Sequence, residues 1–300
     1  MVLRPRKTGR ECAPHVGHSL SAMSPNVILI GQRGHPAAPY REEHVMSRVT
    51  GNQPDGTPTW MELAVPDLDR AMDFYGALFG WTYETEAMEG GRYAVALVGG
   101  QRAAGLMERS DAAGGAWTMY MAVDDCDGTA KRIADAGGRV LWGPVDIRDY
   151  GRAAIAEDTA GAQFGLWQGR AHVGCEVVNE PNSLVRNDLV APVADAARAR
   201  DFYAAVFAYT LDGNPDMADV DFTFLRRPDG HEIGGIMGDA SAGAASWGTC
   251  FEVADTDAAV ARAVAAGGTA TEPEDTVYVR QARVTDPFGT EFVIGARPTT

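Results

Sequence analysis

The sequence predicts an α+β protein made of two tandem copies of one domain, each copy containing two βαβββ units. Residues 59–65 alternate like a strand, and residues 67–79 then carry one apolar face at helical spacing. The same stretch returns at residues 186–209, where the Phe-Tyr pair of 74–75 recurs as 202–203. A period this long indicates a duplicated domain, because solenoid repeats recur every ~20–50 residues.

The first βαβββ unit begins with strand 59–65 and helix 67–79. Asp67 stands where an N-cap residue is wanted, directly after a proline, and Gly80 stands where a helix ends in a left-handed glycine. Glycine pairs then separate three further strands, which we expect at residues 81–86, 92–98 and 102–108.

The pattern restarts within the first copy and is then repeated in the second copy. Strand 116–123 leads to helix 127–136, which a glycine pair ends, and strands follow near residues 139–143, 150–157 and 162–168. The second copy predicts strand 186–192, helix 195–208, strands up to 238, strand 247–253, helix 257–266 and strands up to 295.

These elements divide the chain into four parts. Residues 1–56 show no sustained period, and we expect a poorly ordered N-terminal extension, with Met46 as an alternative start. The first domain spans 57–170, a linker with the loop signature Asn-Glu-Pro-Asn-Ser spans 171–183, and the second domain spans 184–297.

Composition limits the class of protein. A chain of 300 residues that is 45% hydrophobic can bury two cores, and no apolar run reaches the length that spans a membrane. A formal net charge of −15 argues against a nucleic-acid partner, and four scattered cysteines suit a reducing compartment. We therefore expect a cytoplasmic monomer or homodimer that binds a small molecule, with no nucleic-acid or membrane partner.

Three motifs of the first copy resemble the vicinal oxygen chelate superfamily, which includes glyoxalase I, bleomycin-resistance proteins, fosfomycin-resistance enzymes and extradiol dioxygenases. They are strand–Asp–helix–FYxxxFGW, then W-strand-VDD-helix-AGG, and finally D-x-x-GAxFGLW. The likeness covers about 57–297 and is greatest to the tandem two-domain actinobacterial type. It implies that each pair of βαβββ units curls into a cupped half-barrel sheet that holds the ligand.

Metal-dependent members of that superfamily take ligands from four inward-facing strand positions. The resemblance carries these positions onto Trp60, Gly105, Thr118 and Gly165 in the first copy, and onto Arg186 or Asp188, Gly235, Gly248 and Val293 in the second. A divalent site needs about three protein donors, and His172 and His231 are expected at the surface. We therefore expect no metal, no other cofactor, and neither glyoxalase I nor extradiol dioxygenase activity.

By the same resemblance, a ligand pocket is expected in the first copy. Its predicted walls are Trp60 and Glu62 on the first strand, Thr118 and Tyr120 on the fifth, and Gln163, Gly165 and Trp167 on the eighth. Gly105 and Gly165 would make room, and the aromatic walls suit an aromatic ligand. The other three tryptophans of this copy are expected to pack under the helices: Trp81, Trp117 and Trp142.

Glu62 and Tyr120 are the candidate catalytic residues. A partly desolvated Glu62 would have a raised pKa and could act as a general acid or base; the alternative is a salt bridge or an exposed strand face. Tyr120 could donate a hydrogen bond to an oxyanion. Asp188 repeats Glu62 in the second copy, and Arg152 would either hold an anionic ligand group or pair with acidic neighbours.

Three functions follow. The first is a metal-independent enzyme of lyase, isomerase or cyclase type, which moves a proton on a small aromatic molecule of secondary metabolism. The second is a protein that only sequesters its ligand, as bleomycin-resistance proteins do. The third is a degenerate domain kept for assembly, which the second copy fits best. We expect one working pocket, in the first copy.

Overall fold

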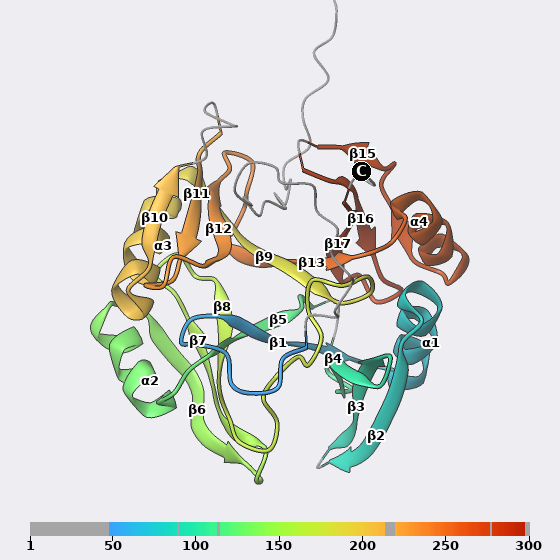
Figure 1. The fold of residues 1–300 in the computed structure, drawn as a ribbon, viewed down its shortest axis with the longest axis horizontal. Helices are drawn as coiled ribbons and strands as arrows, with labels where there is room; N and C mark the ends of the chain where they lie inside the picture. The colour runs from blue at the N-terminus through green and yellow to red at the C-terminus, as the bar shows by residue number, and fades with distance from the viewer. Residues whose placement is uncertain (1–47, 89, 113–114, 214–219, 277, 298–300) are drawn as a thin grey trace, which may run out of the picture.

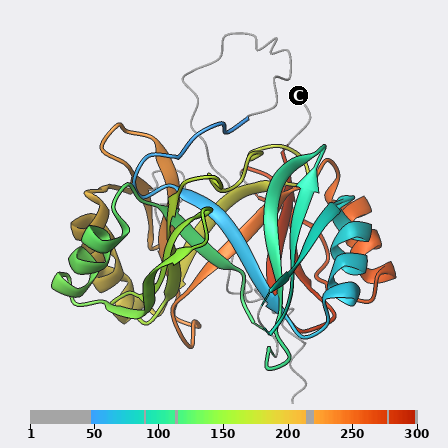
Figure 2. The ribbon, with the colours of Figure 1, turned by 90° about the horizontal axis from the view of Figure 1, so that it is seen from below.

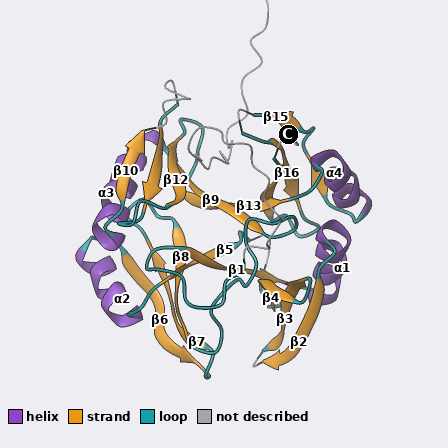
Figure 3. Ribbon diagram, viewed as in Figure 1, coloured by secondary structure: helices purple, strands orange, loops and turns teal. Residues whose placement is uncertain are grey.

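The computed structural model describes residues 48–297, apart from residues 89, 113–114, 214–219 and 277. Each copy forms one mixed sheet with two helices on its outer side, as Figures 1 and 3 show. The predicted α+β fold with four βαβββ units is confirmed. Most of the predicted N-terminal extension lies outside the described residues.

The first sheet has the strand order β2-β3-β4-β1-β5-β8-β7-β6. Its elements along the chain are β1 (Pro58–Val65), α1 (Leu68–Phe79), β2 (Thr82–Met88), β3 (Gly91–Val98), β4 (Gln101–Glu108), β5 (Thr118–Ala122), α2 (Cys126–Asp135), β6 (Arg139–Ile147), β7 (Gly151–Glu157) and β8 (Gln163–Gly169).

The second sheet repeats this order as β10-β11-β12-β9-β13-β17-β16-β14, with β15 also pairing with β16. Its elements are β9 (Leu184–Ala191), α3 (Val193–Phe207), β10 (Thr210–Gly213), β11 (Phe222–Arg226), β12 (Glu232–Gly238), β13 (Ser246–Glu252), α4 (Thr256–Ala265), β14 (Thr269–Ala270), β15 (Glu274–Asp275), β16 (Arg280–Thr285) and β17 (Glu291–Ala296).

Local signals explain where the helices begin and end. The Asp67 side chain accepts a hydrogen bond from the amide of Arg70, and Gly80 closes α1 with φ at 70°. Aspartates cap α2 and α4 in the same way. Helix α3 begins two residues earlier than expected, directly after Pro192, and has no side-chain cap.

The strand β1 occupies the middle of the first sheet, parallel to β4 and antiparallel to β5. Glu62 pairs with Gly105 on one side and with Thr118 on the other. In the second sheet Asp188 pairs with Gly235 of β12 and with Gly248 of β13, the counterparts of Gly105 and Thr118. The register therefore makes Asp188, and not Arg186, the counterpart of Glu62.

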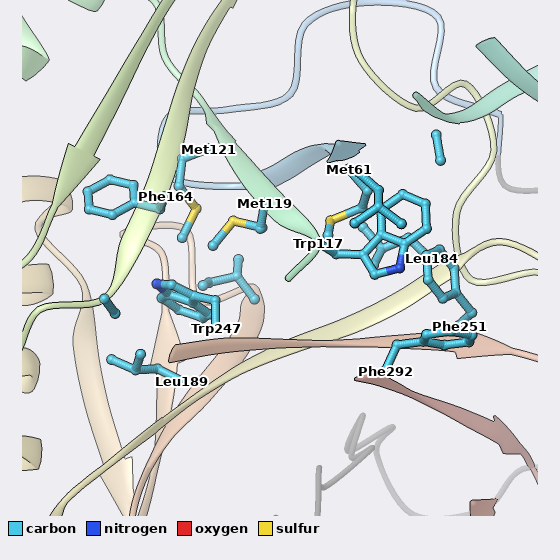
Figure 4. Close-up of a cluster of buried hydrophobic side chains, with 14 of the residues drawn as sticks. Met61, Trp117, Met119, Met121, Phe164, Leu184, Leu189, Trp247, Phe251 and Phe292 are labelled. Carbon is cyan, nitrogen blue, oxygen red and sulfur yellow. The ribbon is translucent and has the colours of Figure 1, made fainter. Parts of the chain in front are cut away.

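The two sheets pack back to back and share one hydrophobic core. Successive residues of a strand point to opposite faces, so β1 sends Met61 and Leu63 into this core and the alternate residues to the other face. Figure 4 shows Met61 and Met119 of the first sheet beside Trp247 and Phe251 of the second. The free, concave faces then open in opposite directions (Figure 1), and we call them cup 1 and cup 2.

Hydrogen bonds cross between the two copies at equivalent places. Helix α1 lies beside α4, and α2 lies beside α3 (Figure 1). The hydroxyl of Tyr75 donates to Asp286 Oδ2 at 2.9 Å, and both groups are buried. Arg132 of α2 donates to the carbonyl of Val206, and Arg262 of α4 donates to that of Leu78. The duplicated Phe-Tyr motif thus joins the two copies.

Two chain segments lie at one end of cup 1, near the starts of β1 and β4; Figure 2 looks into this cup, with β1 crossing the middle. The predicted linker is held to the first sheet by main-chain hydrogen bonds from Cys175 to Thr59 and from Glu176 to Arg102. The amide of Val49 in turn donates to the carbonyl of Glu176. The linker therefore forms part of the wall of cup 1.

The tryptophans divide differently from the sequence expectation. Trp81 and Trp117 lie in the core, as predicted. Trp142 does not pack under a helix: its side chain is 48% exposed on the edge strand β6, and that expectation was wrong. The pairing of β6 with β7 is irregular on both sides of Trp142, so the alternation of inward and outward side chains does not hold there.

No helix in the described part of the chain is long and apolar enough to cross a bilayer.

We predict that Tyr75→Phe lowers the free energy of unfolding by about 1.5–3 kcal/mol, because it removes a hydrogen bond to a buried charged group. Urea denaturation measures this. Tyr83→Phe is the matched control, since the Tyr83 hydroxyl is buried without a hydrogen-bond partner among the described residues. Its removal should be neutral or stabilising, and equal losses for both variants would contradict the role of Tyr75.

Candidate active site in cup 1

Glu62 lies on the floor of cup 1 and accepts two hydrogen bonds from phenols. Tyr93 on β3 donates to Glu62 Oε2 at 2.9 Å, and Tyr120 on β5 donates to Glu62 Oε1 at 3.1 Å. Trp60, two residues earlier on the same face of β1, donates its indole N–H to the Tyr93 hydroxyl at 3.2 Å. The structure thus brings the predicted catalytic pair, Glu62 and Tyr120, into direct contact.

The environment of Glu62 favours a carboxyl group that titrates. Burial raises the pKa of Glu62, and the hydrogen bonds from Tyr93 and Tyr120 oppose that rise. Burial also raises the pKa of both tyrosines well above its usual range, so they stay protonated donors. A carboxyl group whose pKa is shifted toward neutrality in a concave site suits general acid–base chemistry.

The side wall of cup 1 is aromatic. Trp60 and Trp167 are both buried, and the imidazole of His172 packs edge-on against Trp60 with ring centroids 4.4 Å apart. Trp167 donates its indole N–H to the His172 carbonyl at 2.8 Å. Trp60 is 3% exposed, so its ring is packed among its neighbours and is not among the residues that line the hollow described below.

His172 is not the surface residue expected from the sequence. The linker carries its side chain into the cup, where its Nδ1 atom is buried without a partner among the described residues. Burial, aided by the nearby charge of Arg102, lowers the pKa of His172 to about 4, so the imidazole is neutral at pH 7. His231 is exposed, as expected.

A hollow of about 220 Å³ adjoins this cluster. Ala64 and Thr118 line it from the sheet, and the segment after β4 lines it with Arg109, Asp111, Ala112, Gly115 and Ala116. Glu62 is the next residue on the same face of β1 as Ala64, and it pairs with Thr118. Glu62 is therefore a neighbour of two lining residues, Ala64 and Thr118, although its own side chain does not line the hollow. Drug-sized ligands usually occupy about 300–1,000 Å³, so the hollow as it stands suits a smaller molecule or part of a larger one.

The glycines at two predicted pocket positions make room for aromatic side chains of the protein. A Cβ atom at Gly105 would overlap the hydroxyl of Tyr93, and one at Gly165 would overlap the ring of Tyr120. The space that Gly105 and Gly165 leave is therefore filled by the two phenols that hold Glu62. The glycines support the arrangement of the carboxylate and do not themselves line the hollow.

Two further predicted binding residues lie away from Glu62. Gln163 is exposed at the start of β8, where it pairs with Glu157, the last residue of β7. Arg152 forms ion pairs with Asp127 of α2 at 2.7 Å and with Asp146 of β6 at 3.1 Å. Arg152 was expected either to hold an anionic ligand group or to pair with acidic neighbours at the domain interface. It does pair with acidic residues, but both belong to its own domain.

Cup 2 treats its carboxylate differently. Asp188 is 1% exposed and accepts from Nε of the buried Arg186 at 2.8 Å, and Nη1 of Arg186 also donates to Glu232 at 2.7 Å. The rings of Phe222 and Phe224 flank the guanidinium. Arg186 occupies the position of Trp60 and Phe222 that of Tyr93, so cup 2 is filled by an internal ion-pair network.

Neither cup fits a divalent metal. In cup 1 both oxygens of Glu62 accept hydrogen bonds from phenols, and the neighbouring inward positions are two glycines and a threonine. In cup 2 a guanidinium already lies between the two carboxylates. Across the described residues, no group of three or more His, Cys, Asp or Glu side chains is placed to hold an ion.

Sequence reasoning missed Tyr93 and His172. Tyr93 shares one face of β3 with Val95, while Ala94 and Ala96 pack in the core, so strict alternation could have placed it in the cup. Its counterpart Phe222 keeps the ring and lacks the hydroxyl. No sequence signal distinguishes His172, because its position depends on the path of the linker.

We predict that Gly105→Ala lowers the free energy of unfolding by about 1–3 kcal/mol, because the new methyl group must displace the Tyr93 hydroxyl or the edge of Trp60. Denaturant titration measures the change. Gly243→Ala is the control, because Gly243 has open space around its Cβ position. An unchanged stability for Gly105→Ala would mean that the cup is looser than described.

We also predict that His172 makes stability depend on pH. Above about pH 6.5 the imidazole is neutral in both states; as the pH falls toward 4 the unfolded chain gains a proton that the folded chain does not accept. The protein should therefore lose up to about 3 kcal/mol over this interval through His172. His172→Phe should lose correspondingly less. His231→Gln should change the profile less than His172→Phe does, because His231 is more exposed although its pKa is also lowered. Identical pH profiles for His172→Phe and wild type would refute this.

Comparisons with known proteins agree with the geometry. The chain is 36% identical over 248 residues to a protein named "Putative glyoxylase CFP32" from Mycobacterium tuberculosis, covering 80% of this chain and 94% of the relative. It is 35% identical over 262 residues to the anthracycline biosynthesis protein DnrV of Streptomyces peucetius, covering 80% and 92%.

Among solved structures, the Mn(II)-bound glyoxalase from Novosphingobium aromaticivorans shares the fold, with a TM-score of 0.58 at 14% identity over 81% of this chain and 83% of that one. The sequence profile described as Glyoxalase/Bleomycin resistance protein/Dioxygenase superfamily matches residues 57–166 and 186–294. The two repeats, the paired cupped sheets and these matches together show that the chain belongs to the glyoxalase/bleomycin resistance protein/dioxygenase superfamily.

Proposed function

We propose that this protein is an enzyme of secondary metabolism that moves a proton on a small aromatic substrate in cup 1, without a bound metal. The observation that carries the proposal is Glu62: a largely buried carboxyl with a raised pKa, held by two phenols and next to residues that line a hollow. A raised pKa brings a carboxyl group closer to the operating pH, where acid–base catalysis is most effective.

The surroundings support an aromatic substrate. A buried aromatic cluster that includes Trp60, Tyr120 and Trp167 lies beside Glu62, and small and polar residues line the adjoining hollow. Two relatives from Streptomyces are named for anthracycline biosynthesis, which supports a polycyclic aromatic substrate here. The neutral hydroxyl of Tyr120, once free of Glu62, is placed to donate to an oxygen on which negative charge develops.

The second candidate is a protein that sequesters its ligand without turnover. The acceptor oxygens of Glu62 among aromatic rings, together with a formal net charge of −15, would suit a cationic aromatic compound. Binding alone needs the walls of the cup and the charge of Glu62, whereas catalysis needs Glu62 to exchange a proton.

We predict that Glu62→Gln lowers turnover by about 100-fold or more and weakens ligand binding by no more than about tenfold, so that most of the loss lies in the chemical step. Anthracyclines and their polycyclic precursors form the test panel; absorbance follows turnover and tryptophan fluorescence follows binding. Glu84→Gln, at an exposed position of β2, is the control. Full turnover by Glu62→Gln would refute the assignment, and tight binding by the wild type without any conversion across the panel would favour sequestration.

A further inference from the structure

The hydrogen bonds around Glu62 form a chain with a fixed direction. An indole N–H can only donate a hydrogen bond, so Trp60 donates to the Tyr93 oxygen. The Tyr93 hydroxyl in turn donates a hydrogen bond to Glu62 Oε2, and the Tyr120 hydroxyl donates a second one to Oε1. Each oxygen of Glu62 thus accepts from one neutral phenol and keeps a further lone pair available.

The packing around Gly105 makes this chain of hydrogen bonds possible. Gly105, opposite Glu62 in the register, has no Cβ, and only this absence lets the Tyr93 hydroxyl reach between Trp60 and Glu62. In cup 2 the matching ring, Phe222, has no hydroxyl, and a guanidinium holds Asp188 instead. Only cup 1 therefore holds its carboxylate with neutral donors.

The charged and titratable groups facing this site are otherwise engaged. Arg109 and Asp111 pair with each other at the mouth of the hollow. His172 belongs to the linker, and the nearby Arg102 is paired with Glu176. At the rim between β2 and β6, Arg148 and Tyr150 both contact Glu86. The hydrogen bonds that Glu62 itself accepts all come from uncharged groups.

We propose that Trp60 and Tyr93 are positioning residues that hold Glu62 as a hydrogen-bond acceptor, so that the ligand of cup 1 must present a proton to it from a phenol, an enol or an acidic C–H group. This rests on the proposed function for the reaction itself. In the step, the ligand O–H or C–H bond breaks, the proton joins a Glu62 oxygen, and the electron pair stays on the ligand as a phenolate or enolate.

The positioning role is tested without any ligand, by following protonation of Glu62 with infrared difference spectroscopy across pH and assigning the carboxyl band with Glu62→Gln. Tyr93→Phe removes a charge-assisted hydrogen bond and should raise the midpoint by about one pH unit. Trp60→Phe should raise it less. In the Tyr93→Phe background, Trp60→Phe should add nothing, because Trp60 acts only through Tyr93.

The matched control is Trp167→Phe, which removes a cup indole that donates to the His172 carbonyl and should leave the midpoint unchanged. An equal effect of Trp60→Phe with and without Tyr93 would show that Trp60 acts by burial alone and would overturn its positioning role. A midpoint that Tyr93→Phe leaves unchanged or lowers would overturn the role of Tyr93. Because no ligand is present, failure of the proposed catalysis does not affect either result.

The ligand class is tested with 2-naphthol and its methyl ether, which differ in the hydroxyl proton and one methyl group. We expect 2-naphthol to bind at least about tenfold more tightly, measured by quenching of tryptophan fluorescence. The preference should disappear in Glu62→Gln, whose amide has lost the charge. Equal affinities for the two probes, or no binding of either, would overturn the ligand class and leave the positioning result standing.

Discussion

Burial of both faces of the central strands is the constraint on which the rest of the structure depends. Because the sheets pack back to back, β1 sends Met61 and Leu63 into a core shared with the second copy. Its alternate residues then have only the concave side available, and there the sheet is curled. Each side chain on that side must pack against its neighbours, form hydrogen bonds or ion pairs, or face a ligand. The position of Glu62 is therefore set by the same pleat that builds the core.

The two cups solve the same problem in opposite ways. Each central strand carries one acidic residue in the same register, paired with a glycine of the parallel neighbour. In cup 2 the guanidinium of Arg186 bridges Asp188 and Glu232, and Arg226 also pairs with Glu232. In cup 1 uncharged donors hold Glu62, and burial raises the pKa of this residue. Duplication thus produced one scaffold with two different electrostatic interiors: neutral donors surround the carboxylate in the first, and a guanidinium pairs with it in the second.

Local sequence signals carried most of the fold. Period changes and caps such as Asp67 and Gly80 located the helices to within two residues, because these signals act within one turn. The family resemblance brought Glu62 and Tyr120 to one face. The partners of Glu62 depend on tertiary packing: Tyr93 reaches it only past Gly105, and His172 enters through a linker path that no local pattern encodes. The exposure of Trp142 likewise follows from irregular pairing at an edge strand.

The contrast between neutral and charged partners also accounts for the aromatic side chains that surround Glu62. A buried carboxylate without a cation nearby is costly unless donors satisfy it. Phenol and indole groups supply such donors while their rings exclude water, so the carboxylate is satisfied without being neutralised. Trp60 and Tyr93 therefore serve at once as wall and as hydrogen-bond chain. In cup 2 an arginine takes the place of that chain, and its charge opposes the rise in the pKa of Asp188 that burial causes.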